Sequence, residues 1–145
     1  MSIDVVRAEG AWWVEKAGRA VRVPTDAVTT AELLADLKTV RATAELVDAE
    51  SVDVASLDVE SPVTTPCRVV AQMVNYRSHA QESGFDPAKI QPTFFRKASG
   101  SVVGPTSDIV KPAHVRLLDY EIELGLVIGA PVPVGTVVTE QNLHE

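Results

Sequence analysis

The run from Leu118 to Gly129 constrains the fold of this 145-residue chain more than any other stretch. Its second half is β-branched and aliphatic and ends in glycine, which predicts a strand entering a core. Side chains alternate between the two faces of a strand, so Glu121 and Glu123 would share one face with their Cα atoms about 6–7 Å apart. Two carboxylates this close repel each other unless something compensates them. The run is therefore either an amphipathic strand with a solvated glutamate face or part of a site for a hard cation such as magnesium.

The N-terminal part predicts a small lobe of strands and one helix. Short alternating segments separated by glycine turns predict strands at Ile3–Arg7, Ala11–Glu15 and Ala20–Val23. Trp12 and Trp13 are adjacent, so only one of them can face the core. Thr29 and Glu32 have the spacing of a capping box. Apolar residues then recur at helical spacing and predict one helix that covers the strands: Leu33, Leu34, Leu37 and Val40.

An acidic stretch and a proline-rich segment follow this helix. The acidic residues between Glu45 and Glu60 have no evident basic partner, and we interpret the stretch as a solvated face or linker rather than a cation site. Two prolines in the segment Ser61–Pro66 oppose regular strand pairing. We therefore place a boundary here, with an N-terminal lobe at residues 1–62 and a second domain at residues 63–145.

Composition narrows the class of partner and the compartment. The net charge of −7 argues against nucleic acid and against an anionic membrane surface as partners. The one cysteine, Cys67, cannot form an internal disulfide, which fits a reducing compartment. The start of the chain lacks the pattern of a signal peptide, and no apolar run approaches the length of a membrane span. We expect a cytoplasmic protein.

The second half contains a strand and a helical turn with two titratable side chains. The apolar run from Cys67 to Val74 is short enough for a buried strand. His79 and Glu82 are three residues apart, so they share one face of a helical turn and can touch. A carboxylate that contacts an imidazole favours its charged form and orients it, which suits a general base. The alternative is an ordinary surface pair on a helix.

A further strand is predicted from Pro92 to Lys97. Phe94 and Phe95 would face opposite sides of it, one in the core and the other toward a pocket. Lys97 at its end either holds a substrate carboxylate or is an exposed lysine.

The order of three motifs resembles the fumarylacetoacetate hydrolase family. The motifs are N-Y-R-S-H-A-Q-E at 75–82, P-T-F-F-R-K at 92–97, and E-I-E-L-G-L-V-I-G at 121–129. In that family, segments of this kind build one metal-dependent active site. The resemblance runs from about Pro66 to the last residue. It implies an α+β fold, in which a small N-terminal β/α lobe precedes the first part of a mixed β-roll catalytic domain.

The resemblance also implies a reaction and roles for individual residues. The reaction is cleavage of a carbon–carbon bond in a 2-oxo acid or 1,3-dicarbonyl compound through a metal-stabilised enolate. Alternatives are an isomerase, decarboxylase or hydratase of the same family, or a truncated non-catalytic relative. The implied enzyme is a homodimer that takes a small oxo acid as substrate. Its site would comprise His79 and Glu82 as the catalytic pair, Glu121 and Glu123 as ligands of Mg²⁺ or Mn²⁺, and Tyr76, Arg77 and Lys97 as substrate-binding residues.

The chain departs from the family pattern in two respects. The family's third carboxylate ligand, an aspartate, and a later lysine of its site are absent from this sequence, which is expected of the N-terminal part of a longer protein. A glycine usually precedes the family's Asn-Tyr pair, whereas Met73 and Val74 precede Asn75 here. A bulkier residue at this place is expected to alter the turn that presents the motif.

Overall fold

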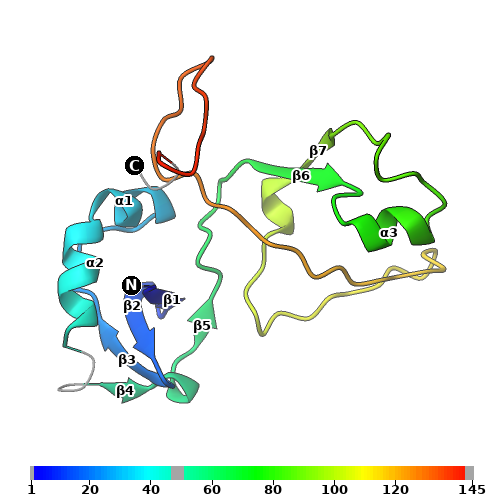
Figure 1. Ribbon diagram of the computed structural model, residues 1–145. Helices are drawn as coiled ribbons and strands as arrows, with labels where there is room; N and C mark the ends of the chain where they lie inside the picture. The colour runs from blue at the N-terminus through cyan, green and yellow to red at the C-terminus, as the bar shows by residue number, and fades with distance from the viewer. Residues whose placement is uncertain (1, 47–50, 143–145) are drawn as a thin grey trace.

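The computed structural model describes residues 2–46 and 51–142, which contain two separate antiparallel sheets together with short helices (Figure 1). The elements are β1 (Asp4–Ala8), β2 (Ala11–Lys16), β3 (Arg19–Arg22), α1 (Thr30–Ala35), α2 (Leu37–Ala44), β4 (Val52–Asp53), η1 (Val54–Ser56), β5 (Val59–Glu60), β6 (Val69–Met73), α3 (Arg77–Glu82), β7 (Thr93–Lys97) and η2 (Ser99–Ser101). The first sheet has the order β4-β3-β2-β1-β5 and the second pairs β6 with β7. This mixture confirms the α+β class, while the mixed β-roll stays a prediction.

The three predicted N-terminal strands form as expected. β1 and β2 are joined by a two-residue turn, because Ala8 lies opposite Ala11. Both turn residues, Glu9 and Gly10, have positive φ angles of 54° and 71°, as a type I′ hairpin requires. Such a turn matches the right-handed twist of the strands, which explains why a local glycine signal predicted the hairpin correctly.

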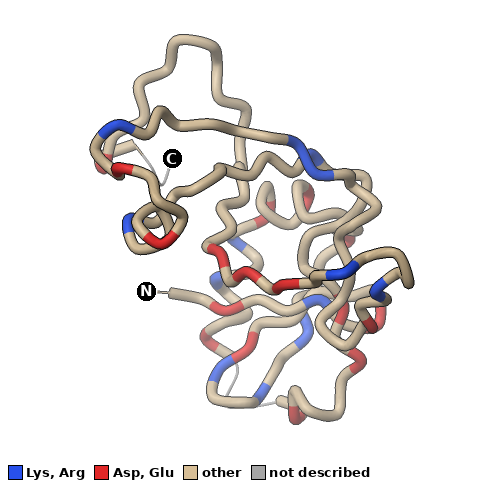
Figure 2. Tube along the Cα trace, turned by 90° about the vertical axis from the view of Figure 1, so that its right-hand side faces the viewer, with Lys and Arg blue, Asp and Glu red and all other residues tan. Residues whose placement is uncertain are grey.

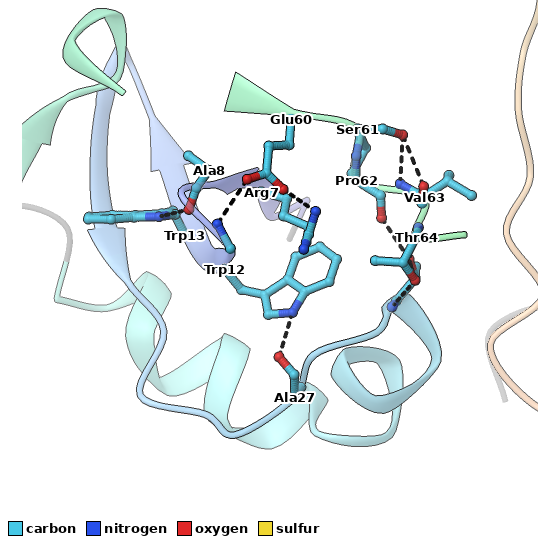
Figure 3. Close-up of polar contacts among 12 residues, drawn as sticks. Arg7, Ala8, Trp12, Trp13, Ala27, Glu60, Ser61, Pro62, Val63 and Thr64 are labelled. Carbon is cyan, nitrogen blue, oxygen red and sulfur yellow. Dashed lines mark hydrogen bonds and ion pairs between the residues drawn. The ribbon is translucent and has the colours of Figure 1, made fainter. Parts of the chain in front are cut away.

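The core lies between this sheet and the helices α1 and α2. Its buried residues are Trp12, Val14, Val23, Leu33 and Val40. The Trp12 indole donates to the carbonyl oxygen of Ala27 at 2.9 Å, so its polar N–H is satisfied inside the core (Figure 3). Trp13 is half-buried, and its indole donates to the carbonyl of Ala8 at 3.2 Å. The prediction that only one tryptophan faces the core is confirmed.

The predicted capping box is also present, but the single helix expected after it is wrong. Glu32 N donates to Thr29 Oγ1 at 3.2 Å, and the Glu32 carboxylate accepts from Thr29 N at 2.9 Å. The helix then breaks at Asp36, whose φ and ψ are −111° and 35°. Asp36 accepts hydrogen bonds from the hydroxyls of Thr25 and Thr39, and such side-chain bonds compete with regular helix continuation.

The acidic stretch has a partner that the sequence did not reveal. Glu60 on β5 forms an ion pair with Arg7 on β1 and accepts from the backbone N–H of Gly10 at 2.9 Å. Figure 3 shows the Arg7 guanidinium between this carboxylate and the indole of Trp12, with Cζ 5.8 Å from the ring centroid. The expectation of an unpaired acidic linker is therefore wrong at Glu60. Asp48 and Glu50 of the same stretch lie outside the described residues.

The largest correction concerns Leu118–Gly129, which forms no strand. Its apolar side chains are exposed: Ile122, Leu124, Leu126 and Ile128. Backbone N–H and C=O groups in a strand need partners on a neighbouring strand. Among the described residues, β6 and β7 pair with each other alone, so the segment has no strand to pair with. The strand prediction is therefore wrong, because the apolar pattern says nothing about whether a neighbouring strand is present to pair with.

The two halves of the chain contact each other near the predicted boundary. Thr30 N donates to Thr64 Oγ1 at 3.0 Å, and Thr64 N donates to Thr30 Oγ1 at 2.9 Å, so the segment after β5 is fastened to α1. A Cβ added at Gly104 would lie 3.5 Å from Ser61 N, and one added at Gly129 would lie 3.6 Å from Leu34 Cδ1. The second half therefore passes close to β5 and α1 (Figure 1). The division into residues 1–62 and 63–145 stays a prediction.

Acidic and basic residues occur in both parts of the chain, whereas residues 124–139 contain none. Figure 2 shows acidic and basic residues interspersed along both parts of the chain rather than gathered on one face. Within the described ranges, no helix has the length and apolar character needed to cross a bilayer.

Candidate functional site

The strand predicted in the run Cys67–Val74 forms as β6, but the expectation that it is buried is wrong, because Val70 is 62% exposed and Met73 is 49% exposed. A strained residue connects this strand to the start of the candidate site. Val74, directly after β6, has a φ of 50°. A β-branched residue in this left-handed region is a genuine outlier, because its side chain crowds the backbone. The backbone thus makes the turn that glycine would make without strain. The positive φ of Val74 adds local strain, and the expectation that a bulkier residue alters this turn relative to the family stays a prediction.

The next segment forms the predicted helical turn, α3, which carries Arg77, His79 and Glu82. The helix ends in a Schellman motif. Phe85 N donates to the carbonyl of Ala80 at 2.8 Å, and Gly84 N donates to that of Gln81 at 3.0 Å. Gly84 has a φ of 78°, which is the conformation that this motif needs after the helix. The motif reverses the chain and brings residues 85–92 back beside β6.

His79 and Glu82 lie one turn apart on α3, and both are exposed. In the part of the chain that the structure describes, no hydrogen bond or ion pair joins them. The predicted contact is therefore absent, although the shared helix is present. The acid–base roles of these two residues stay predictions.

Two adjoining cavities open between β6, α3 and the chain that follows α3. The smaller, of about 170 Å³, is lined by Tyr76 and Arg77 among others. The larger, of about 460 Å³, is lined mostly by residues that sequence reasoning missed, including Met73, Phe85 and Ile90. Gly84 is the sequence signal that could have revealed these lining residues, since a glycine just after a helix predicts that the chain folds back there.

The other predicted site residues are separate from these cavities. His79, Glu82, Lys97, Glu121 and Glu123 line neither of them. Lys97 ends β7 with its Nζ 5.7 Å from the centroid of the Phe95 ring, close enough for a cation–π contact. Phe94 and Phe95 are both exposed, so the expectation that one of them is a core residue is wrong. All five residues of β7 are exposed, so within the described ranges no layer packs on either face of this strand.

Glu121 and Glu123 offer the right donor chemistry for a hard cation but not a complete ligand set. Carboxylate oxygens suit magnesium and manganese. Both glutamates are exposed in the segment 118–129, which forms no strand. Within residues 2–46 and 51–142, no group of three or more His, Cys, Asp or Glu side chains is close enough to hold a metal ion. The structure thus shows two candidate ligands and no third.

Comparison with known proteins assigns the second half of the chain to a family. The model described as "Fumarylacetoacetate (FAA) hydrolase C-terminal" matches residues 68–144. Similar curated proteins include the mitochondrial oxaloacetate tautomerases of Rattus norvegicus and Homo sapiens and the fumarylacetoacetate hydrolase domain-containing protein 2 of Pongo abelii. Each is 39% identical over 69 residues, which is 48% of this chain and 22% of the relative. The match thus spans less than a quarter of the length of these relatives.

No solved structure matches the chain significantly. The family match covers more than half of the sequence and includes every motif on which the resemblance rests. The chain belongs to the fumarylacetoacetate hydrolase family.

Proposed function

We propose that this chain supplies binding and acid–base groups to an enzyme that forms an enolate from a 2-oxo acid or a 1,3-dicarbonyl compound. The family match at residues 68–144 carries the proposal, because it includes all seven predicted site residues. The cavity lined by Tyr76 and Arg77 supports it further, since a guanidinium beside a small cavity suits an anionic substrate.

Each predicted residue has a defined task in this proposal. Arg77 binds the substrate carboxylate, and the Tyr76 hydroxyl donates a hydrogen bond to the same head group. His79 removes a proton, either from the carbon next to the carbonyl or from attacking water. Glu82 orients the imidazole after a side-chain rotation on α3. Lys97 supplies a second cation if β7 approaches the substrate.

Glu121 and Glu123 would hold the divalent cation, magnesium or manganese, that the family uses. Their oxygen atoms fit the preference of such ions, although the ligand shell is not complete among the described residues. When bound, the cation would act as a Lewis acid on the substrate oxygens and lower the cost of enolate formation.

Two reaction branches follow from the same enolate. In hydrolysis, water adds to a carbonyl, the carbon–carbon bond breaks, and its electron pair stays on the departing enolate until that carbon is protonated. In tautomerisation, a proton leaves carbon and another is placed on the carbonyl oxygen, so no carbon–carbon bond breaks. Hydrolysis is the branch that the resemblance implied first. The names of the rat and human relatives favour tautomerisation as the second candidate.

A glutamate variant tests the metal role. We expect magnesium binding, followed by calorimetry, to weaken at least tenfold in Glu123→Ala, because each carboxylate is a direct ligand. Magnesium-dependent turnover should be lost as well. Glu140→Ala removes an exposed carboxylate outside the motif and is the matched control. Magnesium binding that is unchanged in Glu123→Ala would exclude the site. Turnover that persists both in this variant and in the presence of a chelator would exclude it as well.

Proton exchange separates the branches. With oxaloacetate in D₂O, a tautomerase accelerates deuterium exchange at C3 without forming cleavage products. With an acylpyruvate, a hydrolase releases two acids. Nuclear magnetic resonance observes both outcomes in one experiment.

A homodimer and a cytoplasmic location are also proposals. They rest on the resemblance and on composition, and the names of the rat and human tautomerases specify mitochondria for those proteins.

A further inference from the structure

We propose that the preferred substrate of this site is a 2-oxo acid with an apolar chain, bound with its carboxylate at Arg77 and its chain in the larger cavity. The inference rests on the proposed function for the oxo acid head group. It adds the chemical class of the remainder of the substrate, which neither the family match nor the relatives' names specify.

The larger cavity is apolar where a ligand would contact it. Met73 comes from the end of β6, while Phe85 and Ile90 come from the chain that folds back after α3. Phe85 is 56% exposed and Met73 is 49% exposed, so a ligand bound against them would remove apolar surface from water. Removing such surface from water is favourable roughly in proportion to its area. An apolar chain is therefore the complementary ligand.

The charged residues of the larger cavity compensate each other. Lys89 Nζ lies 3.2 Å from Asp86 Oδ2, and Asp86 also accepts from the backbone N–H of Ala88 at 3.0 Å. The larger cavity thus presents no uncompensated charge to a ligand. In contrast, Arg77 at the smaller cavity has no ion-pair partner among the described residues. The charge distribution assigns an anionic head to the smaller cavity and an apolar tail to the larger one.

The two cavities adjoin at shared residues. Val74 and Ile90 line both of them. A ligand that extends from Arg77 toward Phe85 would pass these two side chains. With about 460 Å³ available, the larger cavity has room for a chain of several methylene groups, which individually occupy only a few tens of Å³.

A homologous series of ligands tests the inference. Pyruvate, 2-oxobutanoate, 2-oxohexanoate and 2-oxooctanoate would be titrated into the 145-residue chain by ligand-observed nuclear magnetic resonance. We expect affinity to rise about fourfold per added methylene until the cavity is full, from the value of about 0.8 kcal/mol for each buried CH₂. Affinity that does not change with chain length, or no binding by any member, would overturn the inference.

Matched variants locate the effect. Phe85→Ala should flatten the dependence of affinity on chain length. Phe94→Ala is the control, because Phe94 is 61% exposed and lines neither cavity. Arg77→Gln should weaken all members by a similar factor. A Phe85→Ala variant that binds 2-oxooctanoate like the wild type would overturn the placement of the apolar chain in the larger cavity. If a variant does not fold, the wild-type series alone tests the inference.

The outcomes separate this inference from the proposed function. If binding does not depend on chain length but turnover depends on magnesium, the inference of an apolar tail is wrong and the proposed reaction still stands. If binding depends on chain length but no enolate forms, the apolar binding pocket is supported and the proposed reaction is wrong.

Discussion

Val74 is the residue at which side chain and backbone conflict most. Its φ of 50° lies in the region that glycine enters freely. It also lines both cavities, so the strain occurs where the proposed ligand would bind. Strained residues persist when the surrounding structure determines their conformation, and they often occur at functional sites.

We expect Val74→Gly to raise the free energy of unfolding by about 1 kcal/mol. Relief of the left-handed strain stabilises the folded state by roughly 1–2 kcal/mol. The greater flexibility of glycine in the unfolded chain lowers the free energy of unfolding by roughly 0.5–1 kcal/mol. Urea denaturation measures the difference. Val70→Gly is the control, because Val70 lies within β6, where glycine should only destabilise. A Val74→Gly variant destabilised as much as Val70→Gly would show that the valine side chain contributes more by packing than its backbone costs.

Two carboxylates around α1 give the stability a defined pH dependence. Backbone N–H groups of Val28 and Thr29 donate to Glu32 and hold its pKa below the ordinary value of 4.5. Hydroxyls of Thr39 and Thr25 do the same for Asp36, whose ordinary pKa is 3.8. Because the folded pKa values are lowered, the ionised groups stabilise the fold above these ordinary values. The contribution is lost as pH falls through the folded pKa values.

Thermal unfolding between pH 7 and pH 2 tests this linkage. We expect the melting temperature of the wild type to fall more steeply below about pH 4 than that of Asp36→Asn, which has no carboxylate to protonate. Asp26→Asn changes an exposed aspartate nearby and should keep the wild-type slope. Equal slopes for all three proteins would contradict a stabilising role for the ionised Asp36.

At the scale of secondary structure, the sequence predicted the elements whose signals are local. The Glu9-Gly10 hairpin, the Thr29 capping box and the strand before Asn75 all depend on residues within a few positions of one another. The helix break at Asp36 depends on Thr25, which is eleven residues away. The ion pair of Glu60 with Arg7 joins residues 53 positions apart. Such contacts form only after the chain has folded, so no local pattern contains them.

In the candidate site too, the features that depend on neighbouring residues were predicted, whereas those that depend on contacts distant in sequence were not. Sequence placed His79 and Glu82 on one helical turn, which α3 confirms. It also expected the strand 118–129 to bring Glu121 and Glu123 to that turn. A strand is positioned by hydrogen bonds to neighbours, and within the described residues this segment has none of the required ladder. The helical turn was therefore predictable, whereas the position of Glu121 and Glu123 was not.

Over the whole molecule, packing is concentrated in the N-terminal part. The residues classed as buried are Ala8, Trp12, Val14, Ala20, Val23, Leu33, Val40, Thr43 and Ala80. All but Ala80 precede β4. In contrast, large apolar side chains are exposed along β7 and along residues 117–138. Burial of apolar surface is the main favourable term in folding, so the described part of the second half contributes little to stability by its own packing.

We therefore expect amide hydrogen exchange to divide the chain into a slow and a fast part. Amides of β1, β2 and β3 should exchange about a hundredfold more slowly than those of β6 and β7, because few buried contacts oppose local opening of the second sheet. Mass spectrometry of peptides from the intact chain measures both sets together. Trp12→Ala, which removes the largest buried side chain at a cost of about 3–5 kcal/mol, should remove protection from β1–β3. Phe94→Ala, an exposed position on β7, should leave it unchanged. Equal protection of β7 and β2 in the wild type would show that the second sheet is packed in solution, by a second copy of the chain or by a rearranged segment 117–138.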